Sequence, residues 1–281
     1  CWSLFFRIMP TINRQVVKYC FVLLAGTILA LIFGCTPDHP QSTFDTVGPV
    51  SQSQALIFYI ITYAGLVVFI LVMAILIYSA IKFRRRQNTD ADPEQIHGNN
   101  TLEIAWTVIP ALLLVAVAVP SLKSLFDVTV SPEPEAMTVN VTANQWWFRF
   151  DIPELGVVTA NELHIPVGEV INLRLNSRDV IHSFWVPKLA GKFDMIPNNE
   201  NTMWFQSDEE GIFYGQCAEF CGESHALMRF KVIVESRKEF DNWVQEQLTD
   251  ANKPSDPLTQ QGHDLFMSSE GGCYACHTIR G

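Results

Sequence analysis

Two long apolar segments constrain the fold of this chain more than any other feature of its 281 residues. Residues 55–83 and 104–126 are each long and apolar enough to cross a bilayer as a helix, which takes about 20 residues. Pro110 and Pro120 lie within the second segment, and membrane helices tolerate proline. The sequence therefore predicts a transmembrane hairpin over residues 51–126.

Basic residues predict the orientation of this hairpin. The short loop between the two spans begins with Arg84–Arg86. Because loops rich in Lys and Arg stay in the cytoplasm, both outer ends of the hairpin are expected to face the outside. Arg14 and Lys18 precede an earlier apolar run and predict the same orientation. The domain after the hairpin is therefore expected on the outer, periplasmic face of a bacterial cell membrane.

The N-terminal segment has the features of a secretory signal. Basic residues precede the apolar run 19–33, and a small residue then stands directly before Cys35, as in bacterial lipoprotein signals. We expect residues 1–35 to be signal-like and Cys35 to be a candidate for lipidation; the alternative is an uncleaved anchor with an incidental cysteine. Since the chain begins at Cys1, Met9 is a candidate start, and we expect the C-terminal end to be that of a fragment.

From Asp127 onward, short alternating segments rich in β-branched and aromatic residues are separated by Pro, Gly, Asn and Asp. The expected strands are 137–142, 145–150, 162–165, 170–176, 202–206 and 229–234. Such spacing is typical of an antiparallel sandwich or barrel. A closing helix is expected over 237–248, and the proline-containing segment 249–257 has the composition of a linker. The sequence therefore predicts an all-β domain over residues 127–248.

The charge of the chain limits its partners. The net charge is −10, and the acidic excess lies after the hairpin. An acidic domain does not suit nucleic acid, whose phosphates need Lys and Arg. It suits a basic protein partner that is attracted over a long range, although acidic residues that merely keep the domain soluble would give the same charge.

Soft metal-ligating side chains are concentrated in one short segment. Cys217, Cys221, His225 and Met228 lie close together in the sequence, and His182 lies upstream. Thiolate, imidazole and thioether groups together suit copper rather than magnesium or calcium. A zinc site has little use for methionine and usually spaces its cysteines more tightly. The main alternative is a disulfide between the two cysteines, since the domain is expected in an oxidising compartment.

The order and spacing of these residues resemble the dinuclear copper (CuA) motif of cytochrome c oxidase subunit II. The motif is Cys217-x3-Cys221-x3-His225-x2-Met228, with His182-Ser-Phe upstream. The resemblance covers residues 51–248 and implies a cupredoxin-like Greek-key barrel after the two-helix hairpin. It also implies that both thiolates bridge two copper ions and that each histidine binds one of them. The methionine and the backbone carbonyl of Glu219 would be weaker ligands.

The same resemblance implies roles for other residues. Trp146 matches the tryptophan through which electrons enter from cytochrome c; the alternative is an aromatic side chain that packs the core. The carboxylate of Glu219 matches a residue that helps to bind magnesium or manganese at the contact with subunit I. Glu103, at the cytoplasmic start of the second span, matches the glutamate at the mouth of a proton path into subunit I; the alternative is an interfacial cap.

A second redox motif lies at the C-terminal end. Cys273, Cys276 and His277 form a C-x-x-C-H haem attachment motif, in which two thiols bond to the haem and the histidine binds its iron. Residues 261–266 resemble the first helix of class I cytochromes c. We therefore expect residues 258–281 to begin a fused α-helical cytochrome c domain with covalent haem c; a chance match or a redox dithiol is the alternative.

Together these resemblances imply the subunit through which electrons enter a bacterial haem-copper cytochrome c oxidase. Electrons would pass from cytochrome c, through the fused haem and the copper pair, to subunit I, where oxygen is reduced to water and protons are pumped. Subunit III is a further expected partner. The alternatives are the copper subunit of a related nitric-oxide reductase and, from another class, a copper-delivery lipoprotein. Quinol oxidase subunits share the hairpin and barrel but lack the copper ligands, so Cys217, Cys221 and His225 argue against them.

Overall fold

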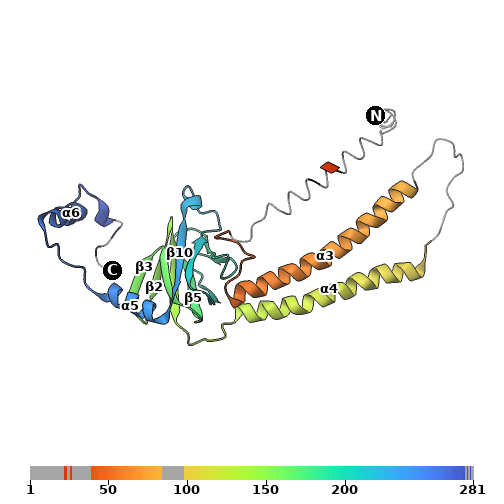
Figure 1. Cartoon of the computed structure of the whole chain (residues 1–281), viewed down its shortest axis with the longest axis horizontal. Coiled ribbons are helices and arrows are strands. Elements are labelled where there is room, and N and C mark those ends of the chain that lie inside the picture. The colour runs from red at the N-terminus through yellow and green to blue at the C-terminus, as the bar shows by residue number, and fades with distance from the viewer. Residues whose placement is uncertain are drawn as a thin grey trace, which may run out of the picture.

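The computed structural model describes residues 22, 23, 26, 39–83, 98–275, 277 and 279. Two long helices form one end of the molecule, a β domain lies next to them, and a small helical segment follows on the far side (Figure 1). Cys35, Arg84–Arg86 and Cys276 lie outside the described residues. The lipidation site and the basic loop therefore stay predictions.

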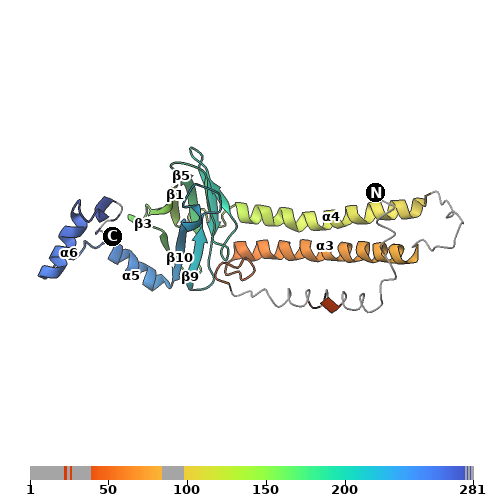
Figure 2. The same ribbon diagram turned by 90° about the horizontal axis from the view of Figure 1, so that it is seen from above.

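The predicted hairpin is confirmed. Helices α3 (Pro49–Lys82) and α4 (Asn100–Thr129) run side by side in both views (Figures 1 and 2). Both are long and apolar enough to cross a membrane, and their apolar windows are unburied by the rest of the chain. Ser53 Oγ lies 2.7 Å from Ser124 Oγ, which links the two helices at their domain-proximal ends. α3 begins before its predicted span, and α4 extends past its span at both ends, because hydropathy marks only the apolar part of a helix.

The β domain contains a five-stranded sheet in the order β3-β2-β1-β5-β8, a three-stranded sheet in the order β4-β10-β9, and the β6-β7 hairpin. The strands are β1 (Thr138–Asn144), β2 (Trp147–Ile152), β3 (Val157–Ala160), β4 (Glu162–Pro166), β5 (Ile171–Ser177), β6 (His182–Phe184), β7 (Phe193–Met195), β8 (Asn201–Phe205), β9 (Gly211–Gln216) and β10 (Arg229–Glu235). The two larger sheets enclose one hydrophobic core. The predicted all-β, cupredoxin-like domain is confirmed.

The expectation of a purely antiparallel domain is wrong for two strand pairs. β1 runs parallel to β5, and β4 runs parallel to β10. Sequence alternation reports which face of a strand is buried but not its direction. Between β3 and β4 the chain turns at Asn161, in the left-handed region at φ 60°, and moves from the larger sheet to the smaller one. A strand that returns later can then lie beside β1 in the same direction.

An aromatic cluster fills the space between the sheets. Its buried members are Phe148, Phe150, Phe184, Phe205 and Phe230. The ring of Phe230 lies 4.7 Å, centre to centre, from those of both Phe148 and Phe184. Burial of one such ring contributes roughly 1.5–3 kcal/mol to stability. This cluster therefore holds together strands that are distant in sequence.

The closing helix α5 (Arg237–Leu248) has the bounds that the sequence predicts. The Ser236 side chain accepts a hydrogen bond from the backbone of Glu239, whose carboxylate bonds back to the Ser236 backbone. This capping box starts the helix at that point. Phe240 and Val244 are its buried residues and fix one face of the helix to the β domain.

The segment before α3 fastens the hairpin to the β domain. Val47 donates its backbone N–H to Lys188 O at 3.0 Å, and Ser51 Oγ donates to the same carbonyl at 2.7 Å. The backbone N–H of Ser51 also donates to Leu189 O at 3.2 Å, and Lys188 forms an ion pair with Asp45. Because these contacts combine backbone and side-chain bonds, the start of α3 has a defined position relative to the sheets.

Candidate metal centre

Strand alternation places two of the predicted ligands above the aromatic core. His182 and Phe184 stand two positions apart on β6, and both are fully buried. Met228 stands directly before β10, two positions before Phe230, and both are also buried. Residues two apart on an extended chain point to the same side. The strands that bury the phenylalanines therefore present a histidine and a methionine next to them.

The loop between β9 and β10 supplies two thiols. Cys217 and Cys221 are both buried, their Sγ atoms lie 3.8 Å apart, and both are free cysteines. The backbone N–H of Cys217 donates to Met228 O at 3.0 Å, which closes the loop at its base. Cys217 and Cys221 therefore do not form a disulfide in this structure.

Each thiol faces one histidine. Nδ1 of His182 lies 3.8 Å from Sγ of Cys217, and Nδ1 of His225 lies 3.5 Å from Sγ of Cys221. Sδ of Met228 lies 3.8 Å from Sγ of Cys221. His182, Cys217 and Cys221 also form a buried group whose donor atoms all lie within 4.8 Å of one another. The structure thus brings all five predicted side-chain ligands to one place.

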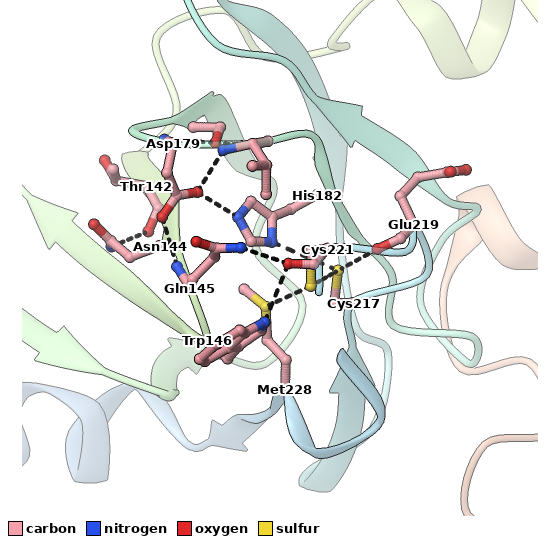
Figure 3. Close-up of polar contacts among 12 residues, drawn as sticks. Thr142, Asn144, Gln145, Trp146, Asp179, His182, Cys217, Glu219, Cys221 and Met228 are labelled. Atoms are coloured by element: carbon pink, nitrogen blue, oxygen red, sulfur yellow. Dashed lines mark hydrogen bonds and ion pairs between the residues drawn. The ribbon is translucent and has the colours of Figure 1, made fainter. Parts of the chain in front are cut away.

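Glu219 presents two different groups to two different neighbours. Its backbone carbonyl oxygen lies 3.2 Å from Sγ of Cys217, next to the thiols. Its carboxylate extends away from the sulfur atoms, as Figure 3 shows, and forms an ion pair with Lys192. Lys192 also bonds Asp194 at 2.6 Å. A divalent cation at the Glu219 carboxylate would therefore have to displace the Lys192 amine.

The surroundings of the two thiols shift their pKa values in opposite directions. Burial favours a higher pKa for Cys217, but hydrogen bonds with His182 and with the backbone of Ser183 outweigh it and lower that pKa to about 6. Burial and the neighbouring Cys217 thiolate raise the pKa of Cys221 to about 12. The Cys217 thiol is therefore the more acidic of the two, and a metal ion bound by both sulfur atoms would have to displace the proton of Cys221.

A carboxylate behind His182 orients its ring. His182 Nε2 bonds Asp179 Oδ1 at 2.7 Å, so that Nδ1 is left to face Cys217 (Figure 3). Asp179 also accepts from the backbone N–H groups of Gln145 and Val180, each at 2.7 Å. A carboxylate on the outer nitrogen of a metal-binding histidine fixes its tautomer and raises its basicity. Asp179 was not predicted from the sequence, although an acidic residue three positions before a candidate ligand was a usable signal.

Trp146 contacts the backbone of a thiol residue directly. Its side chain is half-buried, and its indole Nε1 donates to Cys221 O at 3.1 Å. Gln145 Nε2 donates to the same carbonyl at 2.7 Å, as Figure 3 shows. Trp146 lies just before β2 rather than within it, whereas Phe148, two residues later, packs in the core. The tryptophan therefore joins the protein surface to the thiol loop.

Glu103 lies far from this cluster, at the end of the hairpin opposite the β domain (Figure 1). The Asn99 side chain caps α4 by accepting from Leu102 N at 3.2 Å. Glu103 Oε1 in turn accepts from Asn99 N at 3.3 Å. The exposed Glu103 therefore serves as a helix cap, which is the alternative role, while a part in proton transfer stays a prediction.

The C-terminal motif follows helix α6 (Pro257–Met267), which Asp256 caps at its first turn. Cys273 is exposed and opens a short 3-10 turn, and the backbone N–H of His277 donates to Cys273 O at 2.9 Å. These two residues therefore lie within one turn of each other. Cys276 is outside the described residues, so covalent haem attachment stays a prediction.

Two family models match the chain. Residues 43–124 match the transmembrane domain of cytochrome c oxidase subunit II, and residues 154–236 match its periplasmic domain. The first range covers α3 and most of α4, and the second contains all the predicted copper ligands.

Among curated proteins, cytochrome c oxidase subunit 2 of Alkalihalophilus pseudofirmus is 41% identical, covering 88% of this chain and 73% of the relative. The protein of that name in Bacillus subtilis is 36% identical, covering 94% and 78%. Quinol oxidase subunit 2 of Bacillus subtilis is 31% identical, covering 91% and 79%. A solved structure, the periplasmic domain of subunit II of cytochrome oxidase from Bradyrhizobium japonicum, is 34% identical, covering 40% of this chain and 94% of that chain at a TM-score of 0.39. Because both domain models match and the curated relatives named above cover most of this chain, the chain belongs to the cytochrome c oxidase subunit II family.

Proposed function

We propose that this chain is the subunit through which electrons enter a haem-copper oxidase, and that its β domain holds a dinuclear copper centre. One observation carries the proposal: two buried free thiols lie 3.8 Å apart, and each faces one histidine. A mononuclear blue-copper site needs only one cysteine. The second thiol, with its own histidine, supplies the donors that a second ion requires.

The donor set fits two copper ions by its chemistry. Cys217 and Cys221 would be shared by both ions, His182 and His225 would each bind one, and Met228 and the Glu219 carbonyl would complete the set. When bound, the copper pair would accept and release one electron with its charge spread over both metals and both thiolates. The chain's own part is to hold the donors rigidly and to keep water away with the buried phenylalanines beneath them.

The residues around the centre suggest where electrons arrive. Trp146 is partly open to solvent and bonds directly to Cys221 O. An acidic domain attracts a basic donor such as cytochrome c and accelerates its docking. We therefore assign Trp146 as the point at which electrons enter. A fused cytochrome c domain beginning at residues 258–281, with haem c on Cys273, Cys276 and His277, would raise the effective concentration of such a donor.

The proposal extends to the place of the chain in a complex. The hairpin would lie against subunit I, with subunit III a further partner, and the β domain would face the periplasm. Glu219, with its carboxylate next to Lys192, would contribute to a magnesium or manganese site shared with subunit I. Glu103 would open a proton path at the cytoplasmic end, and Cys35 would carry lipid.

A subunit of a quinol oxidase is the second candidate, because relatives of that name are 31% identical to this chain. The copper content separates the two candidates, since a quinol donor does not need a copper pair to receive its electrons. The clustered thiols and histidines favour the copper-dependent alternative.

Electron paramagnetic resonance on the full chain, in detergent and loaded with copper, tests the proposal. A Cys273→Ser variant keeps any haem signal from overlapping the copper spectrum. Two coppers per chain, with one unpaired electron coupled equally to both nuclei, is the expected result. The spectrum of a single copper, or loss of copper on dialysis, refutes it. A Cys221→Ser control is expected to lose the shared signal, and consumption of oxygen rather than nitric oxide by the purified complex identifies the acceptor.

A further inference from the structure

Trp204 is buried on the outer face of the larger sheet. β8 pairs with β5 so that Trp204 lies opposite Asn172 and Thr202 lies opposite Arg174. Directly paired residues point to the same side of a sheet, and neighbours along a strand alternate. These four side chains therefore share one face, while Met203 points to the core on the other. Trp204 is nevertheless only 7% exposed.

The ends of the membrane helices cover this indole. Trp204 lines a cavity of about 530 Å³ whose other walls include Pro49, Val50 and Phe126, with Asp127 as its charged residue. It also lines a second cavity of about 200 Å³. The lining of the second cavity is mostly polar: Thr129, Ser131, Pro134, Thr138, Asn172, Leu173, Arg174, Thr202 and Met203. The more apolar first cavity and the more polar second cavity thus share Trp204 as a wall, where the hairpin joins the β domain.

Two hydrogen-bond donors at this junction lack an acceptor. Trp204 Nε1 is buried and has no hydrogen-bond partner in the part of the chain that the structure describes. Arg174 is exposed, lines the same polar cavity, and forms no salt bridge among the described residues. By contrast, the Asn172 side-chain amide already donates to the backbone carbonyls of Glu133 and Pro134. Buried donors are normally paired, so the Trp204 indole points to an external acceptor, and the exposed Arg174 guanidinium on the same cavity favours an acceptor that is an anion.

The position of the junction identifies the acceptor. It lies at the ends of α3 and α4 that adjoin the β domain (Figure 2), and since both helices are long and apolar enough to cross a membrane, these ends are expected near the lipid headgroups. Phosphate oxygens are abundant there, indole N–H groups are enriched there, and a guanidinium group is suited to phosphate. A water molecule would satisfy Trp204, but a phosphate would in addition be attracted by the charge of Arg174.

We propose that the polar cavity between the hairpin and the β5-β8 edge binds the phosphate of a phospholipid headgroup. Arg174 and Trp204 Nε1 are the donors, and the hydroxyl groups of Thr129 and Ser131 line the same space. The acyl chains lie along the adjoining apolar cavity and the exposed flank of α4. Such a lipid fills the junction and supports the angle at which the β domain meets the membrane.

Native mass spectrometry of the full chain in a neutral detergent, titrated with phosphatidylglycerol, tests this site. The wild-type chain is expected to retain one phosphatidylglycerol molecule through detergent exchange. Arg174→Gln and Trp204→Phe are each expected to weaken its binding about tenfold, because each removes one donor to a charged group. Arg149→Gln, on β2 of the same sheet, is the charge-matched control and is expected to bind as wild type does.

The source of the phosphate is tested by competition. Inorganic phosphate and a diacylglycerol without a headgroup phosphate are both expected to leave bound phosphatidylglycerol in place. Displacement by inorganic phosphate at equal concentration assigns the site to free phosphate and overturns the lipid assignment. Equal retention by wild type and Arg174→Gln also overturns it, and that exposed substitution does not depend on the folding of Trp204→Phe.

Discussion

Replacing Asp179 by asparagine removes the carboxylate that orients His182. Two carboxylate oxygens serve three groups: Oδ1 bonds His182 Nε2 and Val180 N, and Oδ2 accepts from Gln145 N, all at 2.7 Å. Asparagine has the same shape, but one of its oxygens becomes an N–H₂ group that can only donate. At least one of these bonds is therefore lost, and the charge that supports the imidazole disappears.

The magnitude follows from the kind of bond that is lost. A hydrogen bond to a charged group contributes about 1.5–3 kcal/mol. The Asp179 side chain is 31% exposed, and water reduces this contribution, so that roughly 1.5–2 kcal/mol applies here. Since about 1.4 kcal/mol corresponds to a tenfold change, copper affinity is expected to fall about 10- to 30-fold. This agrees with the roughly 10- to 100-fold loss usual for residues behind a metal-bound histidine.

Competition with a copper chelator on the full chain measures this loss. Asp151→Asn is the matched control, because its carboxylate is 33% exposed and pairs with Arg149, away from the thiols. The Asp179→Asn protein is expected to keep two coppers at saturation and to show altered coupling to the copper nuclei. A fall of less than about threefold, or one equal to that of the control, would refute the orienting role of Asp179.

Two further substitutions test the framework of the domain. Gly215→Ala places a methyl group 2.2 Å from the Phe230 ring, and such overpacking costs about 1–3 kcal/mol. Its thermal unfolding midpoint should fall by several degrees, whereas Gly262→Ala in α6, with no atom within 4 Å of the new methyl group, should leave the β domain unchanged. Ser51→Ala removes the bond from Oγ to Lys188 O and should lower stability by about 1 kcal/mol, measured by the same assay; an unchanged midpoint would contradict the fastening role of this segment.

The sequence predicts those features that depend on local composition. The hairpin follows from two continuous apolar runs, and α5 follows from a helical period that the structure reproduces residue for residue. The clustering of the proposed ligands was also predictable, because these unusual donors stand close together in sequence. Strands β6 and β7 were missed because three residues are too few to show alternation. β3 and β9 were missed as well, and β9 is interrupted by Gly215, where the Phe230 ring leaves no room for a side chain.

The parts that could not be predicted depend on contacts between distant segments. Asp179 orients His182 only because the turn before β2 brings Gln145 N to the other carboxylate oxygen. The direction of β1 relative to β5 depends on where the chain changes sheets, which no single strand encodes. The Trp204 indole, which has no partner among the described residues, can be recognised only once the register of β8 against β5 is known. Each of these features requires the fold before it can be recognised.

The thiol pair has different neighbours on its two sides. On one side, the indole of Trp146 bonds Cys221 O. On the other, the carbonyl of Glu219 lies next to Cys217, and its carboxylate pairs with Lys192, which lines a cavity together with Gln54 of α3. The membrane hairpin thus adjoins the Glu219 side of the thiol pair. On the proposed route, electrons that enter at Trp146 would leave on the Glu219 side, toward the membrane, and the fastening of α3 to the β domain would set the distance over which they travel.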